Sequence, residues 1–244
     1  LLFALPTFIG QIPFLLHKPM GLTHKEAEGV VQSAQKEKVP FMIGLTGRFH
    51  PEFKAAHDAL KQGMIGDIVS MSERIHFGFA DKSLHKHLQN GARGVGLNEG
   101  IHTFDRLHFF TDSRIIRVEG LIKNNKHLGE KLEDYTAGVA VLENGLKAPF
   151  SLRFTDNDDE DYVFQIIGTK GMITVEGFKR CTLKQGGKQT ILFQHDLAKD
   201  FRSRHLPGFK AKTEHFVRLL QGKETENFIQ QGLDAHRAVE LLYS

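Results

Sequence analysis

Short apolar runs and one amphipathic segment alternate at the start of the chain. Residues 1–5 (LLFAL), 14–16 (FLL) and 40–45 (PFMIGL) are apolar runs bounded by turn-forming residues, as buried strands are. Between the second and third runs, apolar residues recur with helical spacing after Thr23 and Glu26, which form a capping box. This order predicts a parallel strand pair joined by a right-handed helical crossover.

The pattern changes near residue 46. Residues 51–62 and 97–110 have the period of helices, whereas residues 68–79 and most segments after residue 115 resemble strands in hairpin order. Two further amphipathic segments predict helices at the end of the chain, over residues 209–221 and 228–243. The expected fold class is a parallel α/β start followed by an α+β body with an antiparallel-rich sheet.

Composition narrows the class of protein. The chain has 244 residues, of which 40% are hydrophobic and 25% charged, as is usual for a soluble globular protein. The formal charge is +3 and no block of consecutive basic residues occurs, so we expect neither a nucleic-acid nor a membrane partner. The single cysteine, Cys181, excludes an intrachain disulfide, and the apolar start has no basic leader. We therefore expect a cytoplasmic protein.

Three patterns in the sequence have features of ligand sites. His85 and His87 alternate but have no third ligand nearby in sequence, and the acidic run 156–162 lacks the glycine of a calcium loop, so no metal site is predicted. The glycine cluster 91–96 (GARGVG) precedes a helix, where phosphate can bind, but it does not follow a strand. A tight loop that turns Asn98 and His102 inward is the favoured interpretation.

Lys18 and His102 are the main candidates for chemistry. Lys18 ends a buried strand, where the carboxyl ends of parallel strands bind ligands, and Pro19 restricts its backbone. His102 has Asn98 at i−4 and Asp105 at i+3, so the three can project from one side of a single helix. Such a histidine suits acid–base catalysis, although a surface hydrogen bond explains the same spacing.

Six segments occur in the order typical of one enzyme family. They are Lys18-Pro19, the capped helix that follows it, GRFHPEF at 47–53, IGDIV at 65–69, GIHTFD at 100–105 and GLDAHRAVELLYS at the C-terminus. In this order the chain resembles the glucose-fructose oxidoreductase and inositol dehydrogenase family (Gfo/Idh/MocA). The resemblance extends over nearly the whole chain.

The resemblance implies two domains. Residues 1–46 would be a partial Rossmann dinucleotide-binding domain, and residues 47–244 an α/β domain with a large, mostly antiparallel open sheet for substrate binding and oligomerisation. The implied function is an NAD(P)-dependent oxidoreductase that transfers hydride to or from a sugar, cyclitol or related polyol. The implied cofactor is NAD or NADP, and the implied assembly is a homo-oligomer formed through the sheet.

The resemblance also implies roles for individual residues. Lys18 would orient and polarise the reacting hydroxyl and His102 would take its proton, with Asn98 at the position of the usual aspartate beside them. The spacing on the helix, rather than the resemblance, suggests that the Asp105 carboxylate orients His102. The residues expected at the cofactor are Leu5, Pro6, His17, Lys18, Pro19 and Arg48.

Three departures from the family pattern keep other functions open. His17 replaces a glutamate of the signature, Asn98 stands at a usual aspartate, and the first part of the Rossmann domain is missing from this sequence. Asparagine cannot raise the basicity of His102 as a carboxylate would. The alternatives are a non-catalytic relative used for oligomerisation or sugar binding, and a glycosidase that uses NAD transiently.

Overall fold

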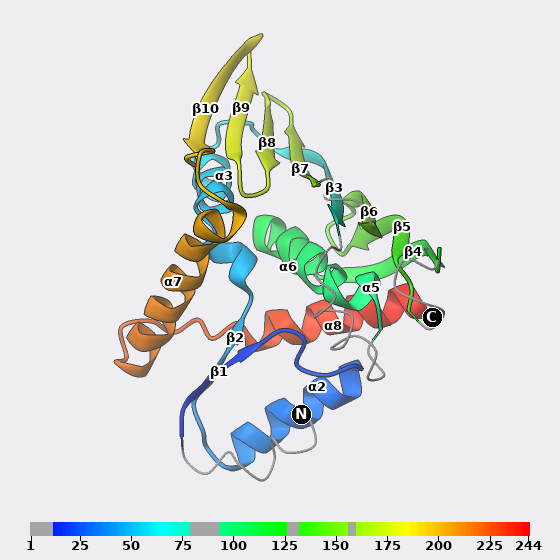
Figure 1. Ribbon diagram of the computed structural model, residues 1–244, viewed down its shortest axis with the longest axis vertical. Helices are drawn as coiled ribbons and strands as arrows, with labels where there is room; N and C mark the ends of the chain where they lie inside the picture. The colour runs from blue at the N-terminus through cyan, green and yellow to red at the C-terminus, as the bar shows by residue number, and fades with distance from the viewer. Residues whose placement is uncertain (1–11, 79–92, 126–131, 156–159) are drawn as a thin grey trace.

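The first described elements form a small parallel sheet. The computed structural model describes residues 12–78, 93–125, 132–155 and 160–244. Strand β1 (Phe14–His17) pairs in parallel with β2 (Phe41–Gly44), and α2 (His24–Lys36) connects the two strands (Figure 1). The predicted strand, helix, strand order is confirmed, whereas the predicted strand at 1–5 lies outside the described residues.

Helix α2 begins at the predicted cap. The Thr23 side chain accepts a hydrogen bond from Glu26 N at 3.1 Å, which satisfies one of the free N–H groups of the first turn. The Glu26 carboxylate accepts from Leu22 N at 2.7 Å. The carboxylate therefore reaches one residue further back than in a standard capping box.

The second sheet is large and open. Its eight strands have the spatial order β10-β9-β8-β7-β3-β6-β5-β4, and β3 and β6 are its one parallel pair among the described residues. This confirms the predicted large, mostly antiparallel sheet. The strands are β3 (Ile68–Gly78), β4 (Ile115–Lys123), β5 (Tyr135–Leu142), β6 (Lys147–Thr155), β7 (Asp161–Gly168), β8 (Met172–Glu176), β9 (Arg180–Gln185) and β10 (Lys188–Gln194).

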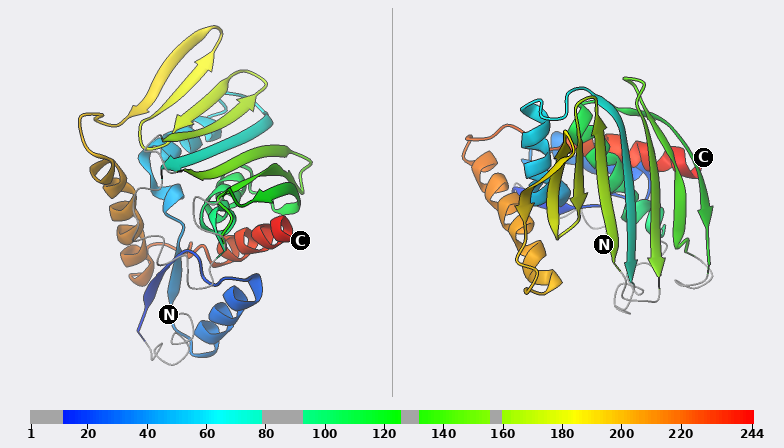
Figure 2. Two further views of the ribbon diagram at one scale, coloured as in Figure 1. Left: turned by 45° about the vertical axis from the view of Figure 1, so that its right-hand side comes forward. Right: turned by 90° about the horizontal axis from the view of Figure 1, so that it is seen from above.

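Helices cover one face of this sheet (Figure 2). Along β3, Met71, Glu73 and Ile75 are buried toward the helices, while the alternate Arg74 is exposed on the other face. These helices are α3 (Pro51–Lys61), α5 (Val95–Asn98), α6 (Gly100–Thr111) and α8 (Ile229–Tyr243), and α7 (Phe201–Leu220) lies beside η2 (Thr46–Phe49).

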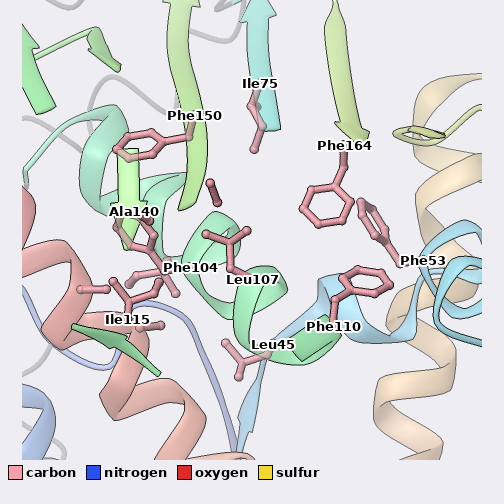
Figure 3. Close-up of a cluster of buried hydrophobic side chains, with 14 of the residues drawn as sticks. Leu45, Phe53, Ile75, Phe104, Leu107, Phe110, Ile115, Ala140, Phe150 and Phe164 are labelled. Atoms are coloured by element: carbon pink, nitrogen blue, oxygen red, sulfur yellow. The ribbon is translucent and has the colours of Figure 1, made fainter. Parts of the chain in front are cut away.

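Aromatic side chains between α6 and the sheet form much of the core (Figure 3). Phe104 meets Phe150 edge to face with ring centroids 5.4 Å apart, and Phe110 stacks on Phe164 at 5.1 Å. Each fully buried phenylalanine contributes about 1.5–3 kcal/mol through removal of apolar surface from water. This packing fixes the orientation of α6 on the sheet, and with it the direction in which His102 projects.

Two helix boundaries differ from the prediction. Helix α7 begins at Phe201 rather than near residue 209, because the Asp200 side chain caps it by accepting from Ser203 N at 2.7 Å. Pro207 lies inside this helix, although Pro207-Gly208 is typical of a break. The segment predicted as one helix over 97–110 is divided at Glu99 into α5 and α6.

Among the described residues, no helix combines the length and apolar character that crossing a bilayer requires.

Candidate active site

A cavity of about 180 Å³ lies where β1 and β2 end, next to α6 and α7. One part of its wall is polar and carries His17, Lys18, Thr46, Glu99, His102 and Arg106. Another part is aromatic and carries His50, Phe77, Tyr162, Phe178, Phe201, His205 and Phe209. Polar groups therefore converge on a space that also offers apolar ring faces.

Lys18 enters this cavity directly after β1. Its Nζ atom donates hydrogen bonds to the main-chain oxygen of Asn98 at 2.5 Å and to Asn98 Oδ1 at 2.6 Å. The peptide bond between Lys18 and Pro19 is cis. Burial lowers the pKa of Lys18, the nearby carboxylate of Glu99 raises it, and Arg106 lowers it further. The ammonium group is thus held in place by neutral oxygen atoms of a single residue.

Asn98 ends the short helix α5, which glycines allow to pack closely. A Cβ atom on Gly94 would lie 1.9 Å from the main-chain oxygen of Glu133, and one on Gly96 would lie 2.7 Å from Tyr243 Oη. Gly96 N also donates to Glu133 Oε1 at 3.2 Å. The described part of the glycine cluster therefore serves close packing, in agreement with the favoured interpretation of a tight loop.

His102 lines the same cavity from α6. Burial lowers its pKa well below 6.5, and the positive charges of Lys18 and Arg106 lower it further. The imidazole is consequently neutral at pH 7 and retains a nitrogen lone pair that can accept a proton. The structure thus brings Lys18, Asn98 and His102 together, as the sequence led us to expect.

Asp105 occupies a different place from the expected one. Its carboxylate accepts three hydrogen bonds from Arg48, two from Nε at 2.9 and 3.1 Å and one from Nη2 at 2.6 Å. The Arg48 guanidinium also lies over the rings of Phe109 and Phe228, at 5.0 and 5.2 Å. The expectation that Asp105 supports His102 is corrected, because the buried carboxylate takes the stronger, charge-assisted partner.

Only some of the residues expected to bind the cofactor line the cavity. His17 and Lys18 line the cavity, and Pro19 follows them in the chain. Arg48 is not part of the cavity wall and is engaged by Asp105. Leu5 and Pro6 lie outside the described residues, as do His85 and His87. Binding of a cofactor by these residues stays a prediction.

Arg106 and Glu73 form a buried ion pair that the sequence analysis missed. Arg106 Nε lies 2.6 Å from Glu73 Oε1, and the two side chains are 4% and 0% exposed. Burial opposes the charge on Arg106, but the carboxylate of Glu73 beside it raises its pKa. Arg106 is one helical turn after His102, so helix spacing places it on the same side. Glu73, the partner of Arg106 on β3, has no sequence feature that predicts this pairing.

A second missed group joins histidine and phenylalanine side chains. The rings of His205 and Phe178 stack with centroids 4.1 Å apart, and His50 packs edge-on to both. Burial lowers the pKa of His205 to about 4. Burial also lowers the pKa of His50 well below 6.5. His50 belongs to the GRFHPEF motif, whereas His205 has no distinguishing sequence signal. These rings give the cavity wall a group of apolar faces.

Lys212 was also missed. It projects from α7, is 1% exposed, and donates to Thr46 Oγ1 at 3.2 Å. Its Nζ atom lies 3.4 Å from His17 Nε2 and 4.5 Å from the centroid of the Phe209 ring. Burial lowers its pKa to about 8.

Comparison with known proteins gives matches to one family. The model of the GFO/IDH/MocA C-terminal domain matches residues 53–174. The rhizopine catabolism protein MocA of Rhizobium meliloti is 29% identical over 100 residues, which are 41% of this chain and 31% of that protein. The galactose/lactose metabolism regulatory protein GAL80 of Saccharomyces cerevisiae is 28% identical over 180 residues, which are 62% of this chain and 41% of that protein. The chain therefore spans less than half of these relatives.

A solved structure has the same fold. An oxidoreductase from Agrobacterium radiobacter, crystallised with NAD+, L-tartaric acid and magnesium, superposes with a TM-score of 0.83 at 21% identity. The match covers 100% of this chain and 75% of the other. Together with the family match over residues 53–174, this agrees with the architecture described above. The chain belongs to the GFO/IDH/MocA family.

Proposed function

We propose that this chain carries the substrate site of an NAD(P)-dependent oxidoreductase that acts on a hydroxyl group of a sugar, cyclitol or related polyol. The observation that carries the proposal is the convergence of Lys18 and His102 on one cavity, although 84 positions separate them in the sequence. Membership of the family supports it, as does the crystallised oxidoreductase that binds NAD+ and L-tartaric acid. In this proposal residues 1–46 belong to the dinucleotide-binding domain and residues 47–244 to the substrate domain.

The cavity edge suits the flat end of a nicotinamide cofactor. Gly44 and Gly47 line the cavity. A Cβ atom on Gly44 would lie 3.3 Å from Leu16 O, and a Cβ atom on Gly47 would lie 3.2 Å from Arg106 Nη1. This narrow edge lies at the carboxyl ends of two parallel strands, where open α/β sheets bind dinucleotides. His17, Lys18 and Pro19 would hold the nicotinamide end. When bound, the nicotinamide accepts or supplies the hydride.

The protein side chains would supply orientation and proton transfer. The Lys18 ammonium, held by Asn98, would donate its remaining hydrogen bond to the substrate oxygen and stabilise negative charge that develops there. His102, neutral because its pKa is lowered, would accept the hydroxyl proton as the carbonyl forms. In the reducing direction it would return that proton to the oxygen. His50, His205 and Phe178 would exclude water and pack on the C–H face of the polyol.

The proposal is tested on the full-length gene product with NAD and NADP and a panel of polyols. A dehydrogenase will change nicotinamide absorbance with at least one member of the panel, and Lys18→Met and His102→Gln will each lower kcat/KM about 10²–10⁴-fold. The unfolding midpoint temperature must stay close to that of the wild type. Full activity in either folded variant would contradict the proposed roles. Product analysis would identify a glycosidase that uses NAD transiently.

A regulatory function is the second candidate, because GAL80 matches 62% of this chain. A regulator that keeps the cavity for ligand recognition would bind a sugar or cofactor without turnover. The two functions are separated by equilibrium binding measured alongside activity. Binding of NAD and a polyol with no redox reaction over hours would favour the regulator.

The proposed homo-oligomer would use the open face of the eight-stranded sheet. Large apolar side chains are exposed on its strands, and of these Leu121 and Ile167 point to the open face, because the preceding positions, Gly120 beside Leu242 of α8 and the buried Ile166, face the helices. Exposed apolar clusters of this kind favour association with a second copy. Light scattering at several concentrations tests this, and a charged substitution such as Leu121→Glu is expected to shift the mass toward the monomer.

A further inference from the structure

Lys212 is an unusual residue to bury. Lysine is rarely fully buried unless it is paired with an opposite charge, because removing an ammonium group from water costs several kcal/mol. Lys212 is 1% exposed, and in the described residues no carboxylate lies within 4.0 Å of its Nζ atom. Its identified neighbours are the Thr46 hydroxyl, the His17 ring and the Phe209 ring, all of which line the cavity.

The other cationic side chains around the site have acidic neighbours. Arg106 pairs with Glu73, and Arg48 pairs with Asp105. Lys18 interacts electrostatically with Glu99. For Lys212, burial is the one cause that shifts its pKa. Over the part of the chain that the structure describes, one buried positive charge that no protein carboxylate offsets thus lies directly behind the cavity wall, in contact with the wall residues His17, Thr46 and Phe209.

The hydrogen bonds around Lys212 leave capacity for a ligand. Thr46 Oγ1 accepts from Lys212 and is 3.3 Å from Gly44 O, so its own proton is directed to that carbonyl. His17 Nε2, which faces the ammonium, acts as an acceptor because burial and the charge of Lys212 lower the pKa of His17. An ammonium group has three protons, and these two contacts use two of them. The third is available for an anion.

We infer that the substrate carries a carboxylate, bound by Lys212 beside Thr46 and His17, so that the substrate class is sugar acids rather than neutral sugars. The inference rests on the proposed function and specifies its substrate. A single ammonium with a hydroxyl and an imidazole matches the single charge of a carboxylate. A phosphate dianion typically takes an arginine fork or several N–H donors, and Arg106, the arginine of the cavity wall among the described residues, is already paired with Glu73.

The test compares acids with their neutral counterparts of the same stereochemistry. D-Glucuronate is paired with D-glucose and D-gluconate with D-glucitol, together with the corresponding galactose and mannose pairs. Binding to the full-length protein saturated with NAD or NADH is measured by calorimetry, and turnover is measured separately. We expect at least one acid to bind about 10–100-fold more tightly than its neutral partner, the value of one charge-assisted hydrogen bond.

Two variants isolate the ammonium group. Lys212→Met is expected to remove the preference for the acid while changing the affinity for the neutral partner less than about twofold. Lys210→Met is the matched control, because Lys210 lies on the same helix with its side chain 76% exposed. It should leave every affinity unchanged. The wild-type comparison needs no variant, so the inference stays testable if Lys212→Met does not fold.

The outcomes separate this inference from the proposed function. Tight binding of a sugar acid without turnover would support the anion site and overturn the dehydrogenase. Turnover of neutral polyols with no preference for any acid would support the dehydrogenase and overturn the anion site. The carboxylate site would be overturned if Lys212→Met lowered the affinity for acid and neutral ligands equally, or if it lowered the affinity for NAD alone.

Discussion

Lys18 Nζ donates to two oxygen atoms of Asn98, the main-chain oxygen at 2.5 Å and Oδ1 at 2.6 Å. One of these bonds survives any substitution of the Asn98 side chain, because it is made to the backbone. The side chain therefore adjusts the position and charge of the ammonium group, while the fold of α5 provides the other half of its anchoring.

Changing Asn98 should alter catalysis through Lys18. Asn98→Ala removes one of two charge-assisted bonds, so we expect kcat to fall about tenfold with little change in stability. Asn98→Asp places a negative charge beside the ammonium and should raise the pKa of Lys18. The pH–rate profile would then extend to higher pH than in the wild type. An unchanged profile in Asn98→Asp would show that Lys18 does not govern the rate.

Acid should destabilise the protein through its buried histidines. The ordinary histidine pKa is 6.5, whereas that of His205 is lowered to about 4. Between these pH values the unfolded chain binds a proton that the folded chain does not, so stability is complete above pH 6.5 and falls as the pH drops toward 4. His50 and His102, whose pKa values are also lowered, add to the same trend.

His205→Gln tests the contribution of one ring. Relative to the wild type, the variant should gain stability as the pH falls from 7 to 4, by at most about 2 kcal/mol after allowance for solvent screening. Urea unfolding at several pH values measures this gain, and the value at pH 7.5 gives the loss of packing alone. A difference that does not vary with pH would contradict the assignment.

Breaking the buried pair of Glu73 and Arg106 should be costly. Both side chains are almost fully buried, so Glu73→Gln leaves the Arg106 charge without compensation. We expect the free energy of unfolding to fall by about 3–5 kcal/mol. The double variant Glu73→Leu, Arg106→Met should recover much of that loss, because it removes both charges. A double-mutant cycle by urea unfolding checks this. Additive losses would show that the two side chains do not interact.

Lys212 should reduce the stability of the unliganded protein near neutral pH. Its pKa falls from 10.5 to about 8 on folding, so the folded state binds fewer protons between these values and stability rises with pH across that window. The groups that face it are His17, His50 and His205, all with lowered pKa values. Below pH 8 the charged form opposes folding by up to about 3 kcal/mol.

Lys212→Met removes this unfavourable charge. We expect the variant to be more stable than the wild type at pH 7, with the advantage shrinking as the pH approaches 10.5. Guanidinium chloride unfolding at pH 7, 8.5 and 10 measures it, and Lys210→Met again serves as the control. A constant difference across these pH values would show that the pKa of Lys212 does not change on folding.

Local sequence was sufficient for much of the fold. The period of apolar residues located α2, α3 and the strands, because burial of one face of each element requires that spacing. The same local signals failed at α7, where the cap at Asp200 and tertiary packing outweigh the breaking tendency of Pro207. Propensity is a weak preference that packing of the whole element can override.

The sequence by itself determined that Lys18 directly follows a parallel strand and that His102 lies on a helix, since both follow from spacing over a few residues. The strand before Lys18, β1, is half-buried rather than buried on both faces as predicted. Only the tertiary structure decided which groups meet. Asp105 pairs with Arg48 instead of supporting His102, and Lys212 lies beside His17 although 195 positions separate them. The physical reason is that periodicity assigns a side chain to a face, whereas its partner depends on which distant face packs against it and which buried charges can be compensated there.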